Sequence, residues 1–172
     1  MKVICEISAR HVHLSKQDLK TLFNINELTP LKPLSQTGQF LSHERVNIKT
    51  EKGEFKNVAI IGPTRESTQV ELSRTDFFNL GIKPENNKIL VNNKILATPI
   101  IAQRHLHIDP TTAKQNNLQD GDIIKAKFDG ERGGILHNVV VRVDKNFTTR
   151  LHIDTDEANA LDFAGGMVTI II

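Results

Sequence analysis

The 172-residue sequence contains one cysteine, no tryptophan, no tyrosine and no long apolar run. Because Cys5 has no second cysteine in the chain, internal disulfide bonds are excluded, and so are zinc fingers or ribbons built on repeated CxxC pairs. A lone cysteine is typical of a reducing compartment, so we expect a cytoplasmic protein. The longest apolar run, Met167 to Ile172, is far shorter than the roughly 20 residues of a membrane-spanning helix. We therefore expect no membrane partner.

Charge and aromatic content argue against a nucleic-acid partner. The 22 basic and 20 acidic side chains leave a formal charge of +2, and eight phenylalanines are the only Phe, Trp or Tyr residues. A nucleic-acid surface requires a basic stripe, often interleaved with aromatic side chains that stack on bases. With 38% hydrophobic and 24% charged residues, the composition is that of an ordinary globular protein, long enough to bury a core.

Short runs of alternating apolar and polar residues dominate the sequence and predict β-strands. The expected strands are EISARHVHL, RVNIKT, FKNVAII, TQVELS, KILV, KILATPII, DIIKAKF, NVVVRV, RLHID and MVTIII. Capping residues, glycine stops and prolines indicate four short helices, at 15–23, 73–80, 111–116 and 156–161. The pattern predicts a mostly β protein, arranged as barrels or a sandwich with small helical caps.

The two halves of the sequence resemble each other. RHVHLS, beginning at Arg10, returns as RHLHID, beginning at Arg104, and a short helical segment follows each copy. The similarity continues through a strand-turn-strand segment and then places Glu71 in register with His152. We interpret the halves as diverged copies of one unit. The segment 83–99, with two prolines and several asparagines, is the expected connection or domain edge.

The repeated HxH motif has the spacing of metal ligands. Alternate residues of a strand lie on one face, about 6 to 7 Å apart at the backbone, so one ion reaches both histidines of a pair. The repeat then adds one further ligand to each pair. The sequence therefore predicts two sites with three protein ligands and an open position, as in catalytic zinc sites: His11, His13 and Glu71, and His105, His107 and His152.

Each of these polar residues also has an interpretation without a functional role. A single HxH is more often an exposed edge or a hydrogen-bonded pair, and it is the second copy that favours metal binding. His43 and His137 are expected at the surface. Arg65, in the turn GPTR, has a planar guanidinium that suits phosphate, although most turn arginines are simply solvated. Arg10 and Arg104 face away from the histidines, as structural ion-pair partners or as the lining of a neighbouring pocket.

Together the motifs resemble the phosphate propanoyltransferase family, the PduL-type phosphotransacylases first associated with propanediol utilisation. The resemblance covers nearly the whole chain and is carried by RHVHLS, LSQTGQF, GPTRESTQVELSRTD, QRHLHIDP, DGERGG and LHIDTDEANA. It implies two β-barrel domains capped by short α-helices, with an internal repeat. One domain is expected to combine residues 1–47 with 100–172, and the other to span 48–99.

The resemblance also implies an enzyme, an acyltransferase. The implied reaction reversibly converts a short-chain acyl-CoA, acetyl or propanoyl, and inorganic phosphate into acyl phosphate and coenzyme A. The expected partners are therefore coenzyme A or acyl-CoA and phosphate. Two zinc ions are the implied cofactors. The His11 group resembles the ligands of the metal that takes the coenzyme A sulfur, the His105 group resembles those of the second metal, and Arg65 is similar to the arginine that holds phosphate. Both groups are expected in one cavity. The preferred acyl group and formation of a homo-oligomer stay open.

The sequence departs from the family pattern in two places. Relatives from bacterial microcompartments carry an amphipathic extension before the first HxH, whereas nine residues precede Arg10, so we expect no encapsulation signal. The segment 83–99 is shorter than usual and poor in glycine. Two alternative functions remain: a metal-dependent hydrolase or cupin-like metal enzyme, and a non-catalytic metal-binding module. The cupin pattern requires a glutamate shortly after HxH, which neither copy has, and a module has no use for Arg65.

Overall fold

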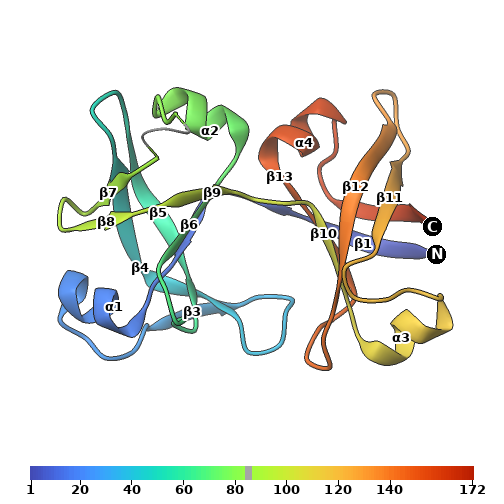
Figure 1. Cartoon of the computed structure of the whole chain (residues 1–172), viewed down its shortest axis with the longest axis horizontal. Helices are drawn as coiled ribbons and strands as arrows, with labels where there is room; N and C mark the ends of the chain where they lie inside the picture. The colour runs from blue at the N-terminus through green and yellow to red at the C-terminus, as the bar shows by residue number, and fades with distance from the viewer. Residues whose placement is uncertain (84–86) are drawn as a thin grey trace. The chain divides into compact units, whose positions relative to one another are not determined.

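The computed structural model describes residues 1–83 and 87–172 and divides the chain into two compact units. The terminal unit comprises Met1–Ala9 and Ala102–Ile172, and the central unit comprises Arg10–Ile101. Each unit has its own core of buried apolar side chains. One unit is a closed barrel and the other a nearly closed one, and both carry short helices, which confirms the mostly β prediction (Figure 1).

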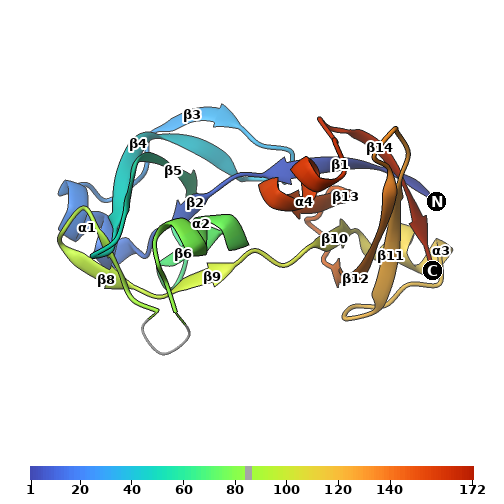
Figure 2. The ribbon, with the colours of Figure 1, turned by 90° about the horizontal axis from the view of Figure 1, so that it is seen from above.

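The terminal unit is a closed barrel of six strands in the order β1-β13-β10-β12-β11-β14. The strands are β1 (Lys2–Ser8), β10 (His105–Ile108), β11 (Ile123–Phe128), β12 (Gly134–Val143), β13 (Arg150–Asp154) and β14 (Gly166–Ile171). Strand β1 closes the barrel, because it pairs in parallel with β13 and antiparallel with β14 (Figure 2). Alternate side chains point inward, as the strictly alternating burial of β11 illustrates.

The central unit is an eight-stranded sheet in the order β8-β7-β4-β5-β2-β6-β9, with β3 added beside β4. The strands are β2 (His11–His13), β3 (Pro30–Pro33), β4 (Phe40–Lys49), β5 (Glu54–Gly62), β6 (Gln69–Leu72), β7 (Ile89–Val91), β8 (Ile95–Ala97) and β9 (Pro99–Ile101). Strand β3 was not expected, because a proline at each end argues against a strand. Its four residues are all exposed, and it pairs only with β4, a position in which proline is tolerated.

The boundary between the units differs from the predicted one. Residues 10–47 belong to the central unit, because β2 and β4 both pair with β5 there. The run EISARHVHL is consequently two strands, and the chain passes from one unit to the other between Ala9 and Arg10. The segment 83–99 was predicted as a connection or a domain edge. Its strands β7 and β8 extend the central sheet, so it is not a connection, and the boundary between the units follows it at Ile101 and Ala102. Residues 84–86 of that segment lie outside the described part of the chain.

Four short helices occur where the sequence predicts them, and no helix end is shifted by more than one residue. They are α1 (Lys16–Phe23), α2 (Arg74–Asn79), α3 (Pro110–Gln115) and α4 (Thr155–Ala160). Each begins after a side chain that accepts a hydrogen bond from a backbone N–H of the first turn: Ser15, Ser73, Asp109 and Asp154. Among the described residues, no helix combines the length and apolar character needed to cross a bilayer.

The strand pairings confirm the internal repeat. In each unit the HxH strand lies between a parallel and an antiparallel neighbour: β2 between β5 and β6, and β10 between β12 and β13. Each HxH strand is followed by a helix, each antiparallel strand is followed by a helix, and an antiparallel hairpin lies between the two in sequence. The repeat thus places equivalent residues in equivalent neighbourhoods, although the sequences have diverged.

Candidate metal centres

The strand register brings the third predicted ligand of each group opposite the first. In the central unit His11 pairs with Glu71 across β2 and β6, and in the terminal unit His105 pairs with His152 across β10 and β13. Residues that are directly opposite on antiparallel strands project to the same face of the sheet. Two residues further along each HxH strand, the second histidine projects to that face as well. Both predicted groups therefore form.

The first group consists of His11, His13 and Glu71. The Nε2 atom of His11 lies 3.6 Å from Oε2 of Glu71, and Nε2 of His13 lies 3.9 Å from Oε1 of the same carboxylate. The two imidazole rings are nearly perpendicular, with centroids 5.0 Å apart. A tetrahedral zinc ion with bonds of 2.0 to 2.2 Å needs ligand atoms about 3.4 Å apart, so these separations fit such an ion with little movement.

His13 is held in the form that a metal ligand requires. Its Nδ1 lies 3.0 Å from the carbonyl oxygen of Ile61, which fixes the Nδ1–H tautomer and leaves the Nε2 lone pair directed at the group. Burial, with smaller contributions from the charges of Arg65 and His11, lowers the pKa of His13 to about 3. The ring is therefore neutral near pH 7, as metal ligation demands.

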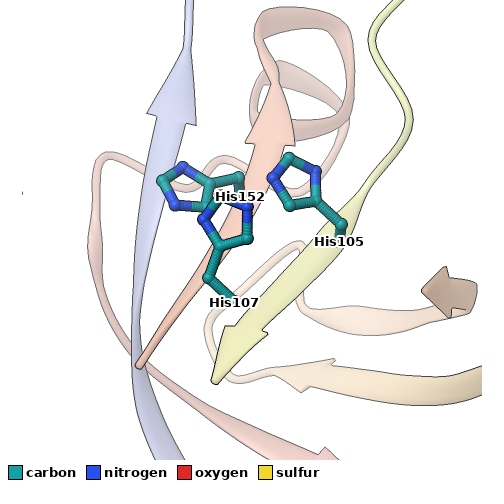
Figure 3. Close-up of side chains that lie close together, drawn as sticks. All are labelled: His105, His107 and His152. Carbon is teal, nitrogen blue, oxygen red and sulfur yellow. The ribbon is translucent and has the colours of Figure 1, made fainter. Parts of the chain in front are cut away.

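The second group consists of three histidines, whose rings gather between β10 and β13 (Figure 3). The ring centroids of His105 and His107 are 4.5 Å apart, and that of His152 lies 5.0 Å from each. Within this group, as within the first, all candidate ligand atoms lie within 4.8 Å of one another. Three imidazoles match the protein ligands of a catalytic zinc site in number and type of donor.

The second group has the same kind of support as the first. Nδ1 of His105 lies 2.7 Å from the carbonyl oxygen of Gln103, so that Nε2 is again the free donor atom. Burial lowers the pKa of His105 to about 3, with the charge of Arg142 contributing. The ring of Phe147 stacks on His107 at 3.9 Å. No sequence signal identifies Phe147, because it follows a turn and belongs to none of the repeated motifs.

Arg65 lies beside the first group at the edge of a small cavity. Its Nη1 is 3.8 Å from Oε1 of Glu71 and 2.5 Å from the side-chain oxygen of Gln69, and its side chain is 39% exposed. The cavity has a volume of about 240 Å³ and is lined by His13, Thr37, Gly38, Gln39, Gly62, Pro63 and Arg65. The LSQTGQF motif thus supplies one wall, a role that sequence reasoning missed even though it singled out the motif.

The remaining polar residues are placed as follows. His43 and His137 are exposed, as predicted. Cys5 is a buried core residue, and burial raises the pKa of its thiol to about 12. Arg10 and Arg104 form ion pairs with carboxylates on the side away from the histidines, which confirms the structural alternative for both. The expectation that the two histidine groups share one cavity stays a prediction, since the two units are described separately.

Comparison with known proteins places these groups in a family. The chain matches the sequence model of phosphate propanoyltransferases over residues 4–164. A phosphate propanoyltransferase of Thermotoga maritima is 41% identical, over 99% of this chain and 89% of the relative. Relatives of the same name from Clostridioides difficile and Listeria monocytogenes are 41% and 38% identical, over 97% and 94% of this chain and 87% and 83% of their own length. The chain belongs to the phosphate propanoyltransferase family, a family of acyltransferases.

Proposed function

We propose that the protein is a phosphate acyltransferase that reversibly converts a short-chain acyl-CoA, acetyl or propanoyl, and inorganic phosphate into acyl phosphate and coenzyme A. The observation that carries this proposal is the pair of three-ligand groups, one in each copy of the repeat, in a chain of this family. Each group has the donor set and the ligand spacing of a zinc site that keeps one position open for substrate.

The two groups hold one zinc ion each. When bound, zinc supplies a Lewis acid that stabilises a thiolate and polarises a thioester carbonyl. The protein's own part is to present neutral imidazoles in a fixed orientation, and the hydrogen bonds from His13 to Ile61 and from His105 to Gln103 do this. The mixed set with Glu71 carries one negative charge, whereas the three-histidine set carries none, so the two sites differ in Lewis acidity.

Arg65 binds the phosphate. Its guanidinium stands at the mouth of the cavity beside His13, and its planar fork matches two phosphate oxygens. One nitrogen of that fork, Nη1, donates to the side-chain oxygen of Gln69 and lies 3.8 Å from Oε1 of Glu71. A cavity of about 240 Å³ is large enough for an inorganic phosphate, and Arg65 in its lining supplies a positive charge, so we assign the cavity to the phosphate.

The acyl group passes directly from sulfur to phosphate oxygen, without an acyl-protein intermediate. Cys5, the only cysteine, is unsuited to act as a nucleophile, because it is 2% exposed and its thiol stays protonated at neutral pH. The thioester carbon–sulfur bond breaks, the new carbon–oxygen bond forms with phosphate, and coenzyme A leaves as the thiolate. Holding a phosphate oxygen next to the carbonyl carbon of the thioester is the main task left for the protein.

Release of coenzyme A from acyl-CoA, measured with and without inorganic phosphate, tests the proposal against its alternatives. We expect release that depends on phosphate and that yields stoichiometric acyl phosphate, measured across two- to four-carbon acyl groups. A metal-dependent hydrolase would release coenzyme A equally without phosphate. A non-catalytic metal-binding module would release none. Either of those results would overturn the proposed function.

A further inference from the structure

An arginine immediately precedes the first histidine of each group, and its side chain contacts the helix that follows the third ligand. In the central unit, Arg10 donates to Oδ1 of Asp76 from Nε at 3.1 Å and from Nη2 at 2.7 Å. Asp76 is the third residue of α2 and is 2% exposed. Its other oxygen, Oδ2, accepts from the backbone N–H of the helix cap, Ser73, at 3.3 Å. One carboxylate therefore joins the HxH strand to the start of α2.

The terminal unit repeats this arrangement with different residues. Nε of Arg104 lies 2.6 Å from Oε1 of Glu157, the third residue of α4. The second oxygen of Glu157, Oε2, accepts from the backbone N–H of Asp154, the cap of that helix, at 3.0 Å. The acid has changed from aspartate to glutamate and the cap from serine to aspartate between the copies. In both copies one carboxylate oxygen contacts the arginine, and the other accepts from the backbone N–H of the helix cap.

Each arginine also contacts the parallel neighbour of the HxH strand that follows it. The guanidinium of Arg10 lies 4.2 Å from the ring centre of Phe55 on β5. Nη1 of Arg104 donates at 2.9 Å to the carbonyl oxygen of His137 on β12. Strands β5 and β12 are the equivalent neighbours in the repeat. Each arginine thus links the start of its HxH strand to the parallel neighbour and to the helix that follows the antiparallel neighbour, although the contacts differ chemically.

The position of the third ligand depends on this connection. Glu71 and His152 each lie two residues before the cap of a six-residue helix. A helix of six residues is too short to be stable by itself, so its position must be set by tertiary contacts. The ion pair ties the first turn of that helix to the residue adjacent to the first histidine. It therefore limits movement of the third ligand relative to the other two.

We propose that Arg10 and Arg104 are positioning residues, each of which fixes the third ligand of its own metal group by clamping the cap of the following helix. The inference rests on the proposed function, in which both groups bind zinc. Residues that orient metal ligands without touching the ion typically contribute 10- to 100-fold to metal affinity. Each arginine should therefore affect the zinc affinity of its own site and not that of the other site.

Zinc affinity of single-site variants tests this assignment. His105→Ala keeps only the central group and His11→Ala only the terminal group, so each parent reports on one site. In the His105→Ala parent, we expect Arg10→Met to weaken zinc binding by about 10- to 100-fold, measured by competition with a chelator. Arg104→Met should leave the affinity of that parent unchanged. In the His11→Ala parent the effects of the two substitutions should be reversed.

Three further variants separate positioning from folding. Arg10→Lys keeps the charge but not the two-pronged contact, and should recover part of the affinity. Arg10→Met combined with Asp76→Asn leaves no buried charge unpaired, so it protects the fold, and its affinity should remain low. Arg74→Met removes an exposed arginine of the same helix and should change nothing. The absorption spectrum of bound Co²⁺ should change with Arg10→Met and not with Arg74→Met.

Two results would overturn the inference, and they are distinguishable. If both parents bind zinc but Arg10→Met and Arg104→Met weaken both sites equally, or neither, the clamps do not position ligands and only the inference fails. If neither parent binds zinc at all, the proposed metal centres themselves fail. Loss of zinc affinity confined to the site of the substituted arginine supports both the inference and the proposed metal centres.

Discussion

At the scale of single residues, a hydrogen bond on Nδ1 determines what His13 and His105 can do. His13 and His105 each donate a hydrogen bond from Nδ1 to a backbone carbonyl oxygen, at 3.0 and 2.7 Å. Nε2 of each ring therefore carries a lone pair that can bind a metal ion. Burial keeps both rings neutral. A histidine in this state is ready for a metal ion without paying a proton-release cost near pH 7.

Arg65→Ala is the substitution that tests anion binding. Removal of the guanidinium takes away charge-assisted hydrogen bonds, each contributing about 1.5 to 3 kcal/mol. We expect the KM for phosphate to rise about 10- to 100-fold, while the KM for acyl-CoA changes little. Initial rates over a range of phosphate concentrations measure this. The KM for phosphate of Arg65→Lys should lie between those of Arg65→Ala and the wild type. Unchanged phosphate kinetics would remove Arg65 from the role.

The ligand residues could be predicted from the sequence because two simple rules determine them. The period of a strand places His11 and His13 on one face. The internal repeat identifies Glu71 as the residue equivalent to His152 in the other unit. Phe147 could not be predicted, since its contact with His107 depends on the path of a turn. The partners of Arg10 and Arg104 were also not predictable, because they lie 66 and 53 residues away along the chain.

At the scale of strands and helices, the end of β5 holds the turn that carries Arg65. Gly62 pairs with Phe40 on β4, and a Cβ at Gly62 would overlap the ring of Phe40. Three residues later, the backbone N–H of Arg65 donates to the carbonyl oxygen of Leu14 at 2.9 Å. The glycine therefore leaves room for the ring of Phe40 against the end of β5, next to the turn that carries Arg65.

Gly62→Ala should consequently weaken phosphate binding by displacing the turn that carries Arg65, although residue 62 itself does not bind phosphate. The added methyl group forces the ring of Phe40 or the end of β5 to move, at a cost of about 1 to 3 kcal/mol in the free energy of unfolding. We expect a several-fold rise in the KM for phosphate, smaller than that of Arg65→Ala. Phe40→Leu in the same chain relieves the overlap and should restore part of the affinity. A normal KM in Gly62→Ala would refute this account of the turn.

The ends of elements were the least predictable feature at this scale. The four helices were recognisable from their caps, and Ser15, Ser73 and Gly81 lie where those signals predict. The break between β1 and β2 was not, because alternation continues through EISARHVHL without a proline or glycine to interrupt it. Which sheet a strand joins depends on pairing partners far away in sequence, and a local pattern carries no such information.

At the scale of the whole molecule, the chain enters the terminal unit, leaves it for the central unit and then returns. Strand β1 contributes the buried side chains of Val3 and Cys5 to a core that otherwise comes from residues 102–172. The association of the N-terminal strand with the C-terminal half was expected from the family resemblance. The correct boundary required knowledge of the long-range pairs.

Hydrogen exchange tests this discontinuous unit. Phe128→Ala removes a buried ring from the terminal core, at a cost of about 3 to 5 kcal/mol. We expect amide exchange to accelerate in peptides from 102–172 and, with them, in peptides from 2–8. Ile48→Ala is the matched change in the central core and should accelerate exchange within 10–101 instead. Peptides from 2–8 that respond to Ile48→Ala and not to Phe128→Ala would contradict the assignment of β1.

The central claim is that two zinc ions, held by the two histidine groups, are needed for transfer of an acyl group to phosphate. Stripping the protein of metal with a chelator and then titrating zinc back, while measuring acyl phosphate formed from propanoyl-CoA, tests it most directly. The account predicts no activity without metal, recovery that levels off near two zinc ions per chain, and no recovery in His105→Ala. Full acyl phosphate formation by metal-free protein, or by His105→Ala, would contradict it.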